Sequence, residues 1–396
     1  MKNILIIGAG GVSRVATYKI AEYKHFDNIV LASRTISKCN EIRDFIKERL
    51  GVEIKTASID ADNLEEVKKL IKESKADILL NVALPYQDLV LMDACSSCKI
   101  AYVDTANYEH PDLAKFEYKE QWARNDDFIK ANTTALLGSG FDPGATNVMC
   151  ALAMQEYFDE IHEIDILDCN AGDHGYAFAT NFNPEINLRE VSANGRYWQE
   201  GKWIETKPLE IKMAWDYPEV GVKNSYLLYH EELESLVKNI KGLKRIRFFM
   251  TFGDSYIQHM NCLQNVGMLK IEPVMHKGQE IIPIEFLKTL LPDPASLGAR
   301  TKGKTNIGCV IKGVKDNKEK TIYIYNVCQH EKCYEKTGAQ AVSYTTGVPA
   351  AIGCYLLATG VWKKIGVCNM EEFPARSFIE QMNKMGLPIK IIEDFK

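Results

Sequence analysis

The chain begins with an apolar run that is interrupted by glycines within a few residues. Asn3–Ile7 are followed by Gly8-Ala9-Gly10-Gly11, and Val12 starts a segment whose apolar residues recur at helical spacing. This order predicts a strand, a tight turn and a helix. Gly8 can adopt a turn conformation that a side chain forbids, Gly10 lets the backbone approach a pyrophosphate, and the helix N-terminus attracts negative charge. We therefore expect Gly8, Gly10, Gly11 and Val12 to bind a dinucleotide; the alternative is a purely structural glycine turn.

The residues after the second predicted strand select the coenzyme. Sites for NAD usually carry an acidic residue here, which accepts hydrogen bonds from the ribose hydroxyls. This chain instead continues from residues 28–32 with Ser33-Arg34-Thr35. A guanidinium flanked by hydroxyl groups suits a 2′-phosphate, because arginine offers a planar and permanently charged fork. Ser33, Arg34 and Thr35 therefore favour NADP(H) over NAD(H), unless Arg34 is an ordinary solvated loop residue.

The composition narrows the class of protein. The 396 residues are enough for two domains, and 46% hydrophobic with 26% charged residues is typical of a soluble globular protein. A formal charge of −5 without a basic tract argues against nucleic-acid binding. The first apolar run is the predicted strand and not a signal peptide, and no apolar stretch reaches the length of a membrane span. We expect a cytoplasmic protein.

Cysteine spacing raises two alternatives to plain packing. The chain has 11 cysteines, an odd number that suits reduced thiols better than a disulfide framework. Cys95 and Cys98 have the spacing of a redox motif, but they end an apolar helix, where cysteine serves as a small buried hydrophobe. Cys328, His330 and Cys333 are potential metal ligands without a second ligand pair nearby in the sequence. We predict no metal site.

Strand and helix signals alternate along residues 1–143. Such alternation is typical of right-handed crossovers in a doubly wound parallel sheet, so we predict an NADP-binding Rossmann domain. The expected strands span residues 3–7, 28–32, 53–58, 76–82, 100–103 and 134–137.

Residues 144–342 have a different pattern, in which strands such as 163–167, 245–251, 305–313 and 320–327 are separated by longer segments. We predict a second, α+β domain with a mixed or antiparallel sheet, which binds substrate and forms a homodimer. Residues 343–396 should return to the Rossmann domain through a helix that is capped by Thr346 or Gly347 and has Pro349 in its first turn. The predicted fold class is α/β.

Ligands of doubly wound sheets bind at the carboxyl ends of the strands, so the residues that follow each strand are candidates for the site. Asp60 is expected beside the adenine, and Pro85 beside the nicotinamide. Each of these segments is alternatively a plain polar loop. In chain order, the candidates are Asp60, Ala83, Pro85, Asp104, Asn107 and Asp142.

The densest polar stretch of the chain spans residues 173–190. It combines ionisable and amide side chains with three aromatic residues and has little periodicity in its first half. Such a loop either folds over a ligand or is disordered, and the aromatics favour order because disordered segments are poor in them. Its candidate site residues are Asp173, His174, Asn181, Glu185 and Arg189.

Taken together, these motifs resemble the saccharopine dehydrogenase superfamily over almost the whole chain. Within it, the loop that ends in residues 181–190 resembles the carboxynorspermidine dehydrogenase branch. Ser13, where the family often has glycine or alanine, is a departure that bears on coenzyme packing. The resemblance is carried by residues 8–12, 32–35, 81–87, 104–108, 140–144, 181–190 and 345–349.

The resemblance implies an oxidoreductase of spermidine biosynthesis. In such an enzyme L-aspartate β-semialdehyde condenses with a diamine, 1,3-diaminopropane or putrescine, and NADPH reduces the imine to carboxynorspermidine or carboxyspermidine. We expect Arg189 to bind a carboxylate and His174 to transfer a proton during carbinolamine dehydration, although both residues are alternatively only loop-ordering. The other predicted substrate-binding residues are Asp104, Asn107, Asp142, Asp173, Asn181 and Glu185, of which Asp104, Asp173 and Glu185 would receive the ammonium group.

Two rival functions stay open on the sequence alone. One is another reaction of the same superfamily, saccharopine formation or cleavage, whose substrate would need a further cationic carboxylate clamp. The other is a non-catalytic dinucleotide-binding module, against which the ionisable and aromatic loop of residues 173–190 argues.

Overall fold

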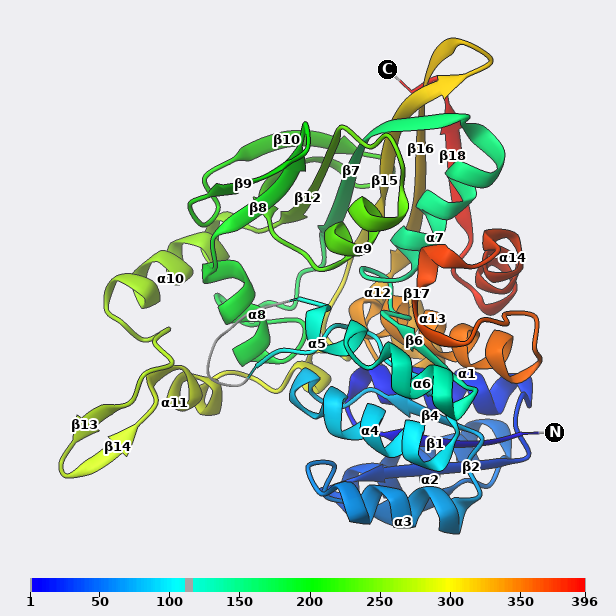
Figure 1. Cartoon of the computed structure of the whole chain (residues 1–396). Coiled ribbons are helices and arrows are strands. Elements are labelled where there is room, and N and C mark those ends of the chain that lie inside the picture. Colours follow the sequence, from blue (N-terminus) through cyan, green and yellow to red (C-terminus); the bar gives the residue numbers. More distant parts are fainter. Residues whose placement is uncertain (1, 111–116, 396) are drawn as a thin grey trace.

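The first sheet consists of seven parallel strands within the part of the chain that the computed structural model describes, residues 2–110 and 117–395. Its strand order, β17-β6-β5-β4-β1-β2-β3, confirms the predicted doubly wound sheet (Figure 1). The strands are β1 (Asn3–Ile7), β2 (Asn28–Ser33), β3 (Lys55–Ser58), β4 (Ile78–Asn81), β5 (Ala101–Val103), β6 (Thr134–Leu137) and β17 (Gly366–Asn369).

Helices cover both faces of this sheet, because its central strands are apolar on both sides. Ile4 and Leu5 point to opposite faces and are both fully buried, each in a different hydrophobic cluster. Asn63 caps α3 by accepting hydrogen bonds from the N–H groups of Glu65 and Glu66. The helices of this domain are α1 (Gly11–Tyr23), α2 (Ile36–Leu50), α3 (Leu64–Ser74), α4 (Asp88–Cys98), α5 (Lys119–Trp122) and α6 (Asn125–Ala131).

The second sheet is mixed, as predicted. β12 and β7 pair in parallel, and the remaining neighbours along the order β10-β11-β12-β7-β15-β16-β18 are antiparallel. A two-residue turn with positive φ at Asp316 and Asn317 joins the two longest strands. The strands are β7 (Glu160–Asn170), β8 (Gly195–Gln199), β9 (Lys202–Thr206), β10 (Lys212–Tyr217), β11 (Gly221–Leu228), β12 (Arg245–Thr251), β15 (Lys304–Lys315), β16 (Lys318–Gln329) and β18 (Ile389–Glu393).

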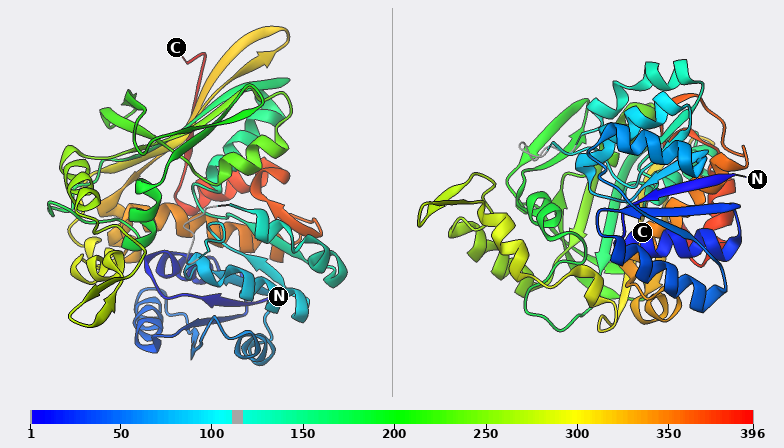
Figure 2. Two further views of the ribbon diagram at one scale, coloured as in Figure 1. Left: turned by 60° about the vertical axis from the view of Figure 1, so that its left-hand side comes forward. Right: turned by 90° about the horizontal axis from the view of Figure 1, so that it is seen from below.

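The helices of the second domain lie between this sheet and the first domain and along its edge (Figure 2). Asn183 caps α8, so the helix begins at Pro184, near the middle of the polar stretch that was expected to be a loop. The helices are α7 (Ala145–Leu152), α8 (Pro184–Ser192), α9 (Glu232–Asn239), α10 (Asp254–Asn265), α11 (Pro283–Leu290), α12 (His330–Thr337), α13 (Ala341–Ala358) and α14 (Ala375–Met385).

Helix α13 begins earlier than predicted, and Pro349 lies in its interior instead of in its first turn. The lost backbone hydrogen bond is tolerated because the helix is held by packing: Gly347 lies against Val12 and Val15 of α1, where a Cβ would come within 2.6 Å of the Val15 side chain. Contrary to our expectation that no apolar stretch is long enough, the helix has the length and composition of a membrane span, but 67% of it is buried inside the protein. It is therefore a core helix.

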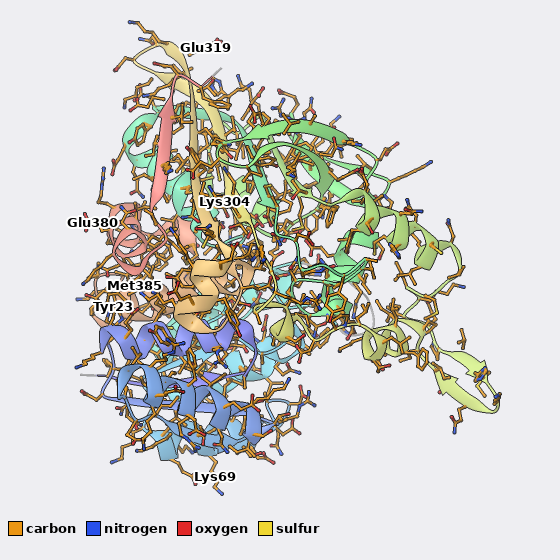
Figure 3. The ribbon with its side chains drawn as sticks, turned by 180° about the vertical axis from the view of Figure 1, so that it is seen from behind. Tyr23, Lys69, Lys304, Glu319, Glu380 and Met385 are labelled. Carbon is orange, nitrogen blue, oxygen red and sulfur yellow. The ribbon has the colours of Figure 1, made fainter. Side chains whose placement is uncertain are left out.

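The C-terminal segment contributes to both sheets. β17 extends the first sheet beside β6, whereas β18 pairs with β16 at the edge of the second. Between them, α14 ends beside α1, where the ammonium group of Lys19 donates to the Met385 carbonyl at 2.7 Å, and Tyr23 and Met385 lie close together (Figure 3). These contacts join the two domains into one body.

An arm projects from the second domain (Figures 1 and 2). It consists of α10, the hairpin of β13 (Val274–His276) and β14 (Gln279–Ile281), and α11. Ile284 and Leu287 of α11 pack against Leu188 of α8, which ties the base of the arm to the helix that borders the site. We had not predicted this arm.

Candidate active site

Two adjoining cavities lie between the domains. The larger has a volume of about 880 Å³ and follows the carboxyl ends of the first sheet; the smaller, of about 260 Å³, lies under residues 170–187. Both are lined by Asp142, Asp168, Asn181, Phe182 and Met250, so they meet at one wall. The arrangement provides a long groove for a coenzyme and two connected spaces for substrates.

The glycine-rich turn forms one end of the larger cavity, where Gly8, Gly10, Gly11 and Val12 all line it. Gly8 has φ +114°, and a Cβ there would lie 2.4 Å from the Val82 carbonyl oxygen. A Cβ at Gly10 would meet no protein atom within 4 Å, which leaves the backbone open to a ligand. This is the open cradle that a pyrophosphate requires.

The adenosine end of the cavity carries charged side chains of both signs. Ser33, Arg34 and Thr35 line it, together with Lys38 from the first turn of α2, a residue that we did not predict and whose ammonium group lies 3.5 Å from Asp293. These groups fit a 2′-phosphate. Asp62, instead of the predicted Asp60, lines this part of the cavity.

The nicotinamide end lies where β4, β5 and β6 finish. Ala83, Pro85, Asn107 and Asp142 all line the larger cavity here. The backbone N–H of Asn107 donates to Glu231 at 3.3 Å, which links this end to the second domain.

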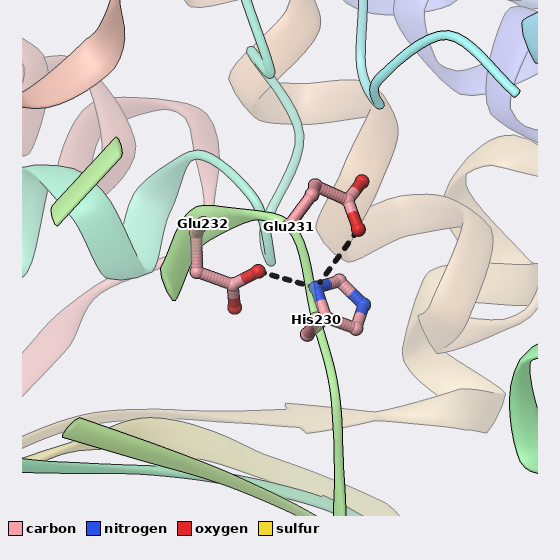
Figure 4. Close-up of side chains that lie close together, drawn as sticks. All are labelled: His230, Glu231 and Glu232. Carbon is pink, nitrogen blue, oxygen red and sulfur yellow. Dashed lines mark hydrogen bonds and ion pairs between the residues drawn. The ribbon is translucent and has the colours of Figure 1, made fainter. Parts of the chain in front are cut away.

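Acidic side chains surround His230 at the inner end of the larger cavity. Its Nδ1 contacts Glu232 and lies 3.3 Å from Glu231 (Figure 4), and its Nε2 lies 3.5 Å from Glu190. Glu231 and His230 come from the connection between β11 and α9, and Glu190 comes from α8. We call His230, Glu190, Glu231 and Glu232, together with Asp142 and Asp168, the acidic cluster.

Electrostatics in the acidic cluster follow from burial and from the excess of carboxylates. Burial raises the pKa of Glu190 to about 8, although His230 opposes the shift. Burial alone would lower the pKa of His230, but Glu232 and Glu231 raise it well above its usual value, so the imidazole is protonated. No ion pair to lysine or arginine is found for these carboxylates within the described ranges, so a cationic ligand would complete the charge balance.

His230, Glu231 and Glu232 also have ligand atoms within 4.8 Å of one another, a spacing that a metal ion could use. The imidazole is already engaged as a cation by the carboxylates. We therefore interpret the three residues as an ion-paired group.

Arg189 lies outside both sets of lining residues. Its side chain is 3% exposed, and its Nε lies 2.8 Å from Glu109. Its Nη1 lies 3.4 Å from Glu185 and donates a hydrogen bond to the Tyr86 hydroxyl at 2.9 Å. The cause is helical periodicity: Asn183, Ile186 and Glu190 share the face of α8 that lines the larger cavity, whereas Glu185 and Arg189 share another face. This placement gives Arg189 a structural role instead of the predicted carboxylate-binding role.

Two further predicted residues lie behind the site. Asp104 accepts hydrogen bonds from the Gly138 N–H at 2.6 Å and from Gln121 at 2.7 Å, so it orders the loop after β6. Glu185 is bound by Lys288 at 2.9 Å and by the Tyr86 hydroxyl at 2.9 Å. Neither lines the described cavities, so direct contact with an ammonium group is not supported for either.

The smaller cavity contains the other predicted loop residues. Asp173, His174 and Asn181 line it, together with Tyr256 and other hydroxyl and amide groups. Burial lowers the pKa of His174, and its Nδ1 accepts a hydrogen bond from the Tyr176 N–H at 3.1 Å. The cavity thus offers hydroxyl and amide groups beside the carboxyl groups of Asp142, Asp168 and Asp173.

The sequence analysis missed Asp168, His230 and Glu231 as site residues. Asp168 continues the strand alternation of Ile164 and Ile166, which puts a carboxylate on a face that is otherwise in the core. That polar residue on an apolar face was a usable signal. The run of ionisable residues that follows β11 was another.

Comparisons with known proteins agree with this architecture. Residues 4–136 match the saccharopine dehydrogenase NADP binding domain, and residues 140–387 match the saccharopine dehydrogenase C-terminal domain. Apo saccharopine dehydrogenase (L-Glu forming) from Saccharomyces cerevisiae has a similar fold, with a TM-score of 0.74 at 15% identity over 99% of this chain and 100% of that one.

Two curated proteins are similar over their full length. Carboxyaminopropylagmatine dehydrogenase from Synechocystis is 54% identical over 98% of this chain and 97% of its own. Carboxynorspermidine synthase from Vibrio cholerae is 39% identical over 99% of this chain and 97% of its own.

Proposed function

This chain belongs to the saccharopine dehydrogenase family, and we propose that it catalyses the NADPH-dependent condensation of L-aspartate β-semialdehyde with an amine that carries a second cationic group. It is an NADP-dependent oxidoreductase that acts on small molecules. The product would be a secondary amine that carries a carboxyaminopropyl group.

We propose agmatine as the preferred amine, with putrescine and 1,3-diaminopropane as weaker substrates. Carboxyaminopropylagmatine dehydrogenase from Synechocystis is 54% identical to this chain, whereas carboxynorspermidine synthase from Vibrio cholerae is 39% identical. Agmatine ends in a guanidinium and the diamines end in an ammonium, so all three present a cation to the site. This proposal adds agmatine to the diamines that the sequence led us to expect.

The observation that carries the proposal is the acidic cluster. Asp142, Asp168, Glu190 and Glu231 line the cavity that continues from the coenzyme groove, and among the described residues the imidazole of His230 contacts Glu190 and Glu231 as a counter-charge. Buried carboxylates are costly without partners, and a cationic substrate would supply them. A substrate with a second amino-acid end would place another carboxylate in this region, which the cluster would repel.

The residues present fit NADPH. The open backbone at Gly10 faces the cavity for the pyrophosphate, and Arg34 is available to the 2′-phosphate, with Lys38, whose ammonium group lies 3.5 Å from Asp293, also lining the cavity. Ala83, Pro85 and Asn107 border the nicotinamide end, beside the acidic cluster. When bound there, NADPH supplies the hydride that reduces the imine.

We also propose a homodimer that forms in the cytoplasm. The projecting arm supports a second copy as its partner, because Val266, Met275 and Leu290 are 68%, 68% and 66% exposed. Light scattering should give the mass of two chains, and Met275→Glu should shift it toward one. A single-chain mass for the wild type would refute the dimer.

The experiment that tests the function is a panel of amines. NADPH oxidation is followed with L-aspartate β-semialdehyde and agmatine, putrescine, 1,3-diaminopropane or lysine, with NADH as the coenzyme control. We expect amine-dependent oxidation of NADPH, fastest with agmatine. Activity with lysine alone would favour a saccharopine-type reaction, and NADPH binding without turnover of any pair would favour a binding module.

A further inference from the structure

Asp142 and Asp168 lie where the two cavities meet, and they come from different domains. Asp142 belongs to the loop after β6, and Asp168 lies near the end of β7 in the second sheet. Both side chains line both cavities. A bond formed between substrates that occupy the two cavities would therefore form beside this pair.

The two carboxyl groups are close neighbours. After burial, Asp168 is the largest cause that raises the pKa of Asp142, and Oδ2 of Asp142 is buried without a hydrogen-bond partner among the described residues. The charge of His230 lowers the pKa of both aspartates and that of Glu232 raises it, and Asp168 in turn raises the pKa of Glu190. Two carboxylates in contact cannot both ionise readily, and burial raises the pKa of the pair further.

We propose that Asp142 and Asp168 share one proton and act together as the acid that expels water from the carbinolamine formed between the aldehyde and the amine. This inference rests on the proposed function. It moves the proton-transfer role that we expected for His174 to the aspartate pair.

The proton can be followed through each step. The pair, which starts with one shared proton and one negative charge, accepts a second proton from the substrate ammonium, and the resulting free amine attacks the aldehyde carbon to form a C–N bond. After the proton on nitrogen moves to oxygen, the pair returns its proton to the carbinolamine hydroxyl, the C–O bond breaks, and water leaves. The product of this step is an iminium ion, whose positive charge faces the ionised pair, and the amine formed by reduction takes a proton from solvent.

The histidines nearby suit this step less well. Burial lowers the pKa of His174, which leaves it without a proton to donate near neutral pH. His230 is held as a cation by Glu232 and Glu231, which makes its proton hard to release. The shared proton of the aspartates has neither disadvantage.

The division into two cavities also suggests where the substrates bind. The larger cavity ends in Glu190 and Glu231, which attract the distal cation of the amine and repel a carboxylate. The smaller cavity presents the Asp173 carboxyl group together with hydroxyl and amide groups such as Tyr256 and Asn187, which can bind the ammonium and the carboxylate of an amino-acid end. The aldehyde and the primary amine then meet at Asp142 and Asp168.

The test compares Asp142→Asn and Asp168→Asn with the wild type. The amides are close in shape and can still hydrogen-bond to the remaining carboxyl group, so the variants should fold. Asp165→Asn is the matched control, because Asp165 lies on the same strand but binds Arg247 outside the cavities at 2.8 Å. Circular dichroism and NADPH binding are measured for all four proteins.

We expect each pair variant to lose kcat by roughly 10²–10⁴-fold with little change in NADPH affinity, whereas the control stays close to the wild type. In single turnovers with NADPH deuterated at the transferred position, the isotope effect of the pair variants should approach 1, because dehydration then limits the rate. A loss of kcat under about threefold overturns the proposal. An isotope effect in the slowed pair variants that is as large as in the wild type also overturns it.

A second measurement does not depend on turnover. Carbon-13 NMR of aspartate carboxyl groups in the full chain with NADP⁺ bound should show a protonated carboxyl at pH 7, in addition to those of buried aspartates such as Asp104, that is absent from both pair variants. Two ionised carboxylates at pH 7 overturn the proposal. Failure of the proposed function is distinguishable, since the wild type itself would then be inactive with every amine, and both proposals would fall.

Discussion

Replacing Glu190 by glutamine should weaken amine binding in a way that depends on pH. The side chain is 8% exposed, lines the larger cavity and faces His230, and its pKa is raised to about 8 by burial. Because the folded-state pKa is raised, Glu190 is mostly neutral at pH 7 and charged at pH 9. A cationic amine that binds it at pH 7 must first bring about its ionisation.

The magnitude follows from two terms. A hydrogen bond between charged groups contributes about 1.5–3 kcal/mol, and ionising a group one pH unit below its pKa costs about 1.4 kcal/mol. Glu190→Gln should therefore raise the KM for the amine by roughly 10–150-fold at pH 9, but by a factor about tenfold smaller at pH 7. The KM for NADPH should not change.

The assay is NADPH oxidation at varied agmatine concentration, at both pH values. Glu200→Gln, an exposed substitution in a turn of the second domain, is the matched control. Because the pKa of Glu190 is higher in the folded than in the unfolded state, its contribution to the free energy of unfolding is lost as pH rises from about 4.5 to 8. The free energy of unfolding of the glutamine variant should therefore fall less over that range than that of the wild type. An unchanged KM at pH 9, or an equal effect at both pH values, would refute the account of Glu190.

Three further substitutions test other parts of the structure. Arg34→Ala should raise the KM for NADPH by roughly 10–100-fold and leave that for NADH unchanged, and equal effects would argue against a 2′-phosphate contact. Gly10→Ala should weaken coenzyme binding without lowering Tm. Gly8→Ala should weaken coenzyme binding and also lower Tm, because its Cβ would lie 2.4 Å from a carbonyl oxygen. Calorimetry with and without NADPH separates the effect on binding from the effect on stability. Arg189→Met should lower the free energy of unfolding by about 3–5 kcal/mol, and adding Glu109→Leu should recover part of the loss in urea titrations; an unaltered stability would contradict the structural role of Arg189.

The sequence predicted the first domain well because its signals are local. The run from Asn3 through the glycine turn to the helix beginning at Gly11 is a continuous segment, and so is Ser33-Arg34-Thr35 at the end of β2. The order of parallel strands follows from alternation and crossover handedness. Such features depend little on what lies elsewhere in the chain.

The inner part of the site depends on contacts between distant segments. Arg189 is an attractive ligand for a carboxylate by residue type, but the Glu109 side chain, 80 positions away, lies 2.8 Å from it in the fold. Asp142 and Asp168 become a pair only when the loop after β6 meets β7. The start of α13 was misjudged for a related reason, because packing against α1 overrides the local preference of Pro349.

The most direct test of reductive condensation is the fate of the transferred hydride. NADPH deuterated at the transferred position is incubated with the enzyme, L-aspartate β-semialdehyde and agmatine, and the product is analysed by mass spectrometry. The account predicts one product that contains both substrates joined through a secondary amine, with one deuterium on the carbon beside the new nitrogen link. Deuterium found only in the alcohol formed by reducing the free aldehyde, with no joined product, would contradict it.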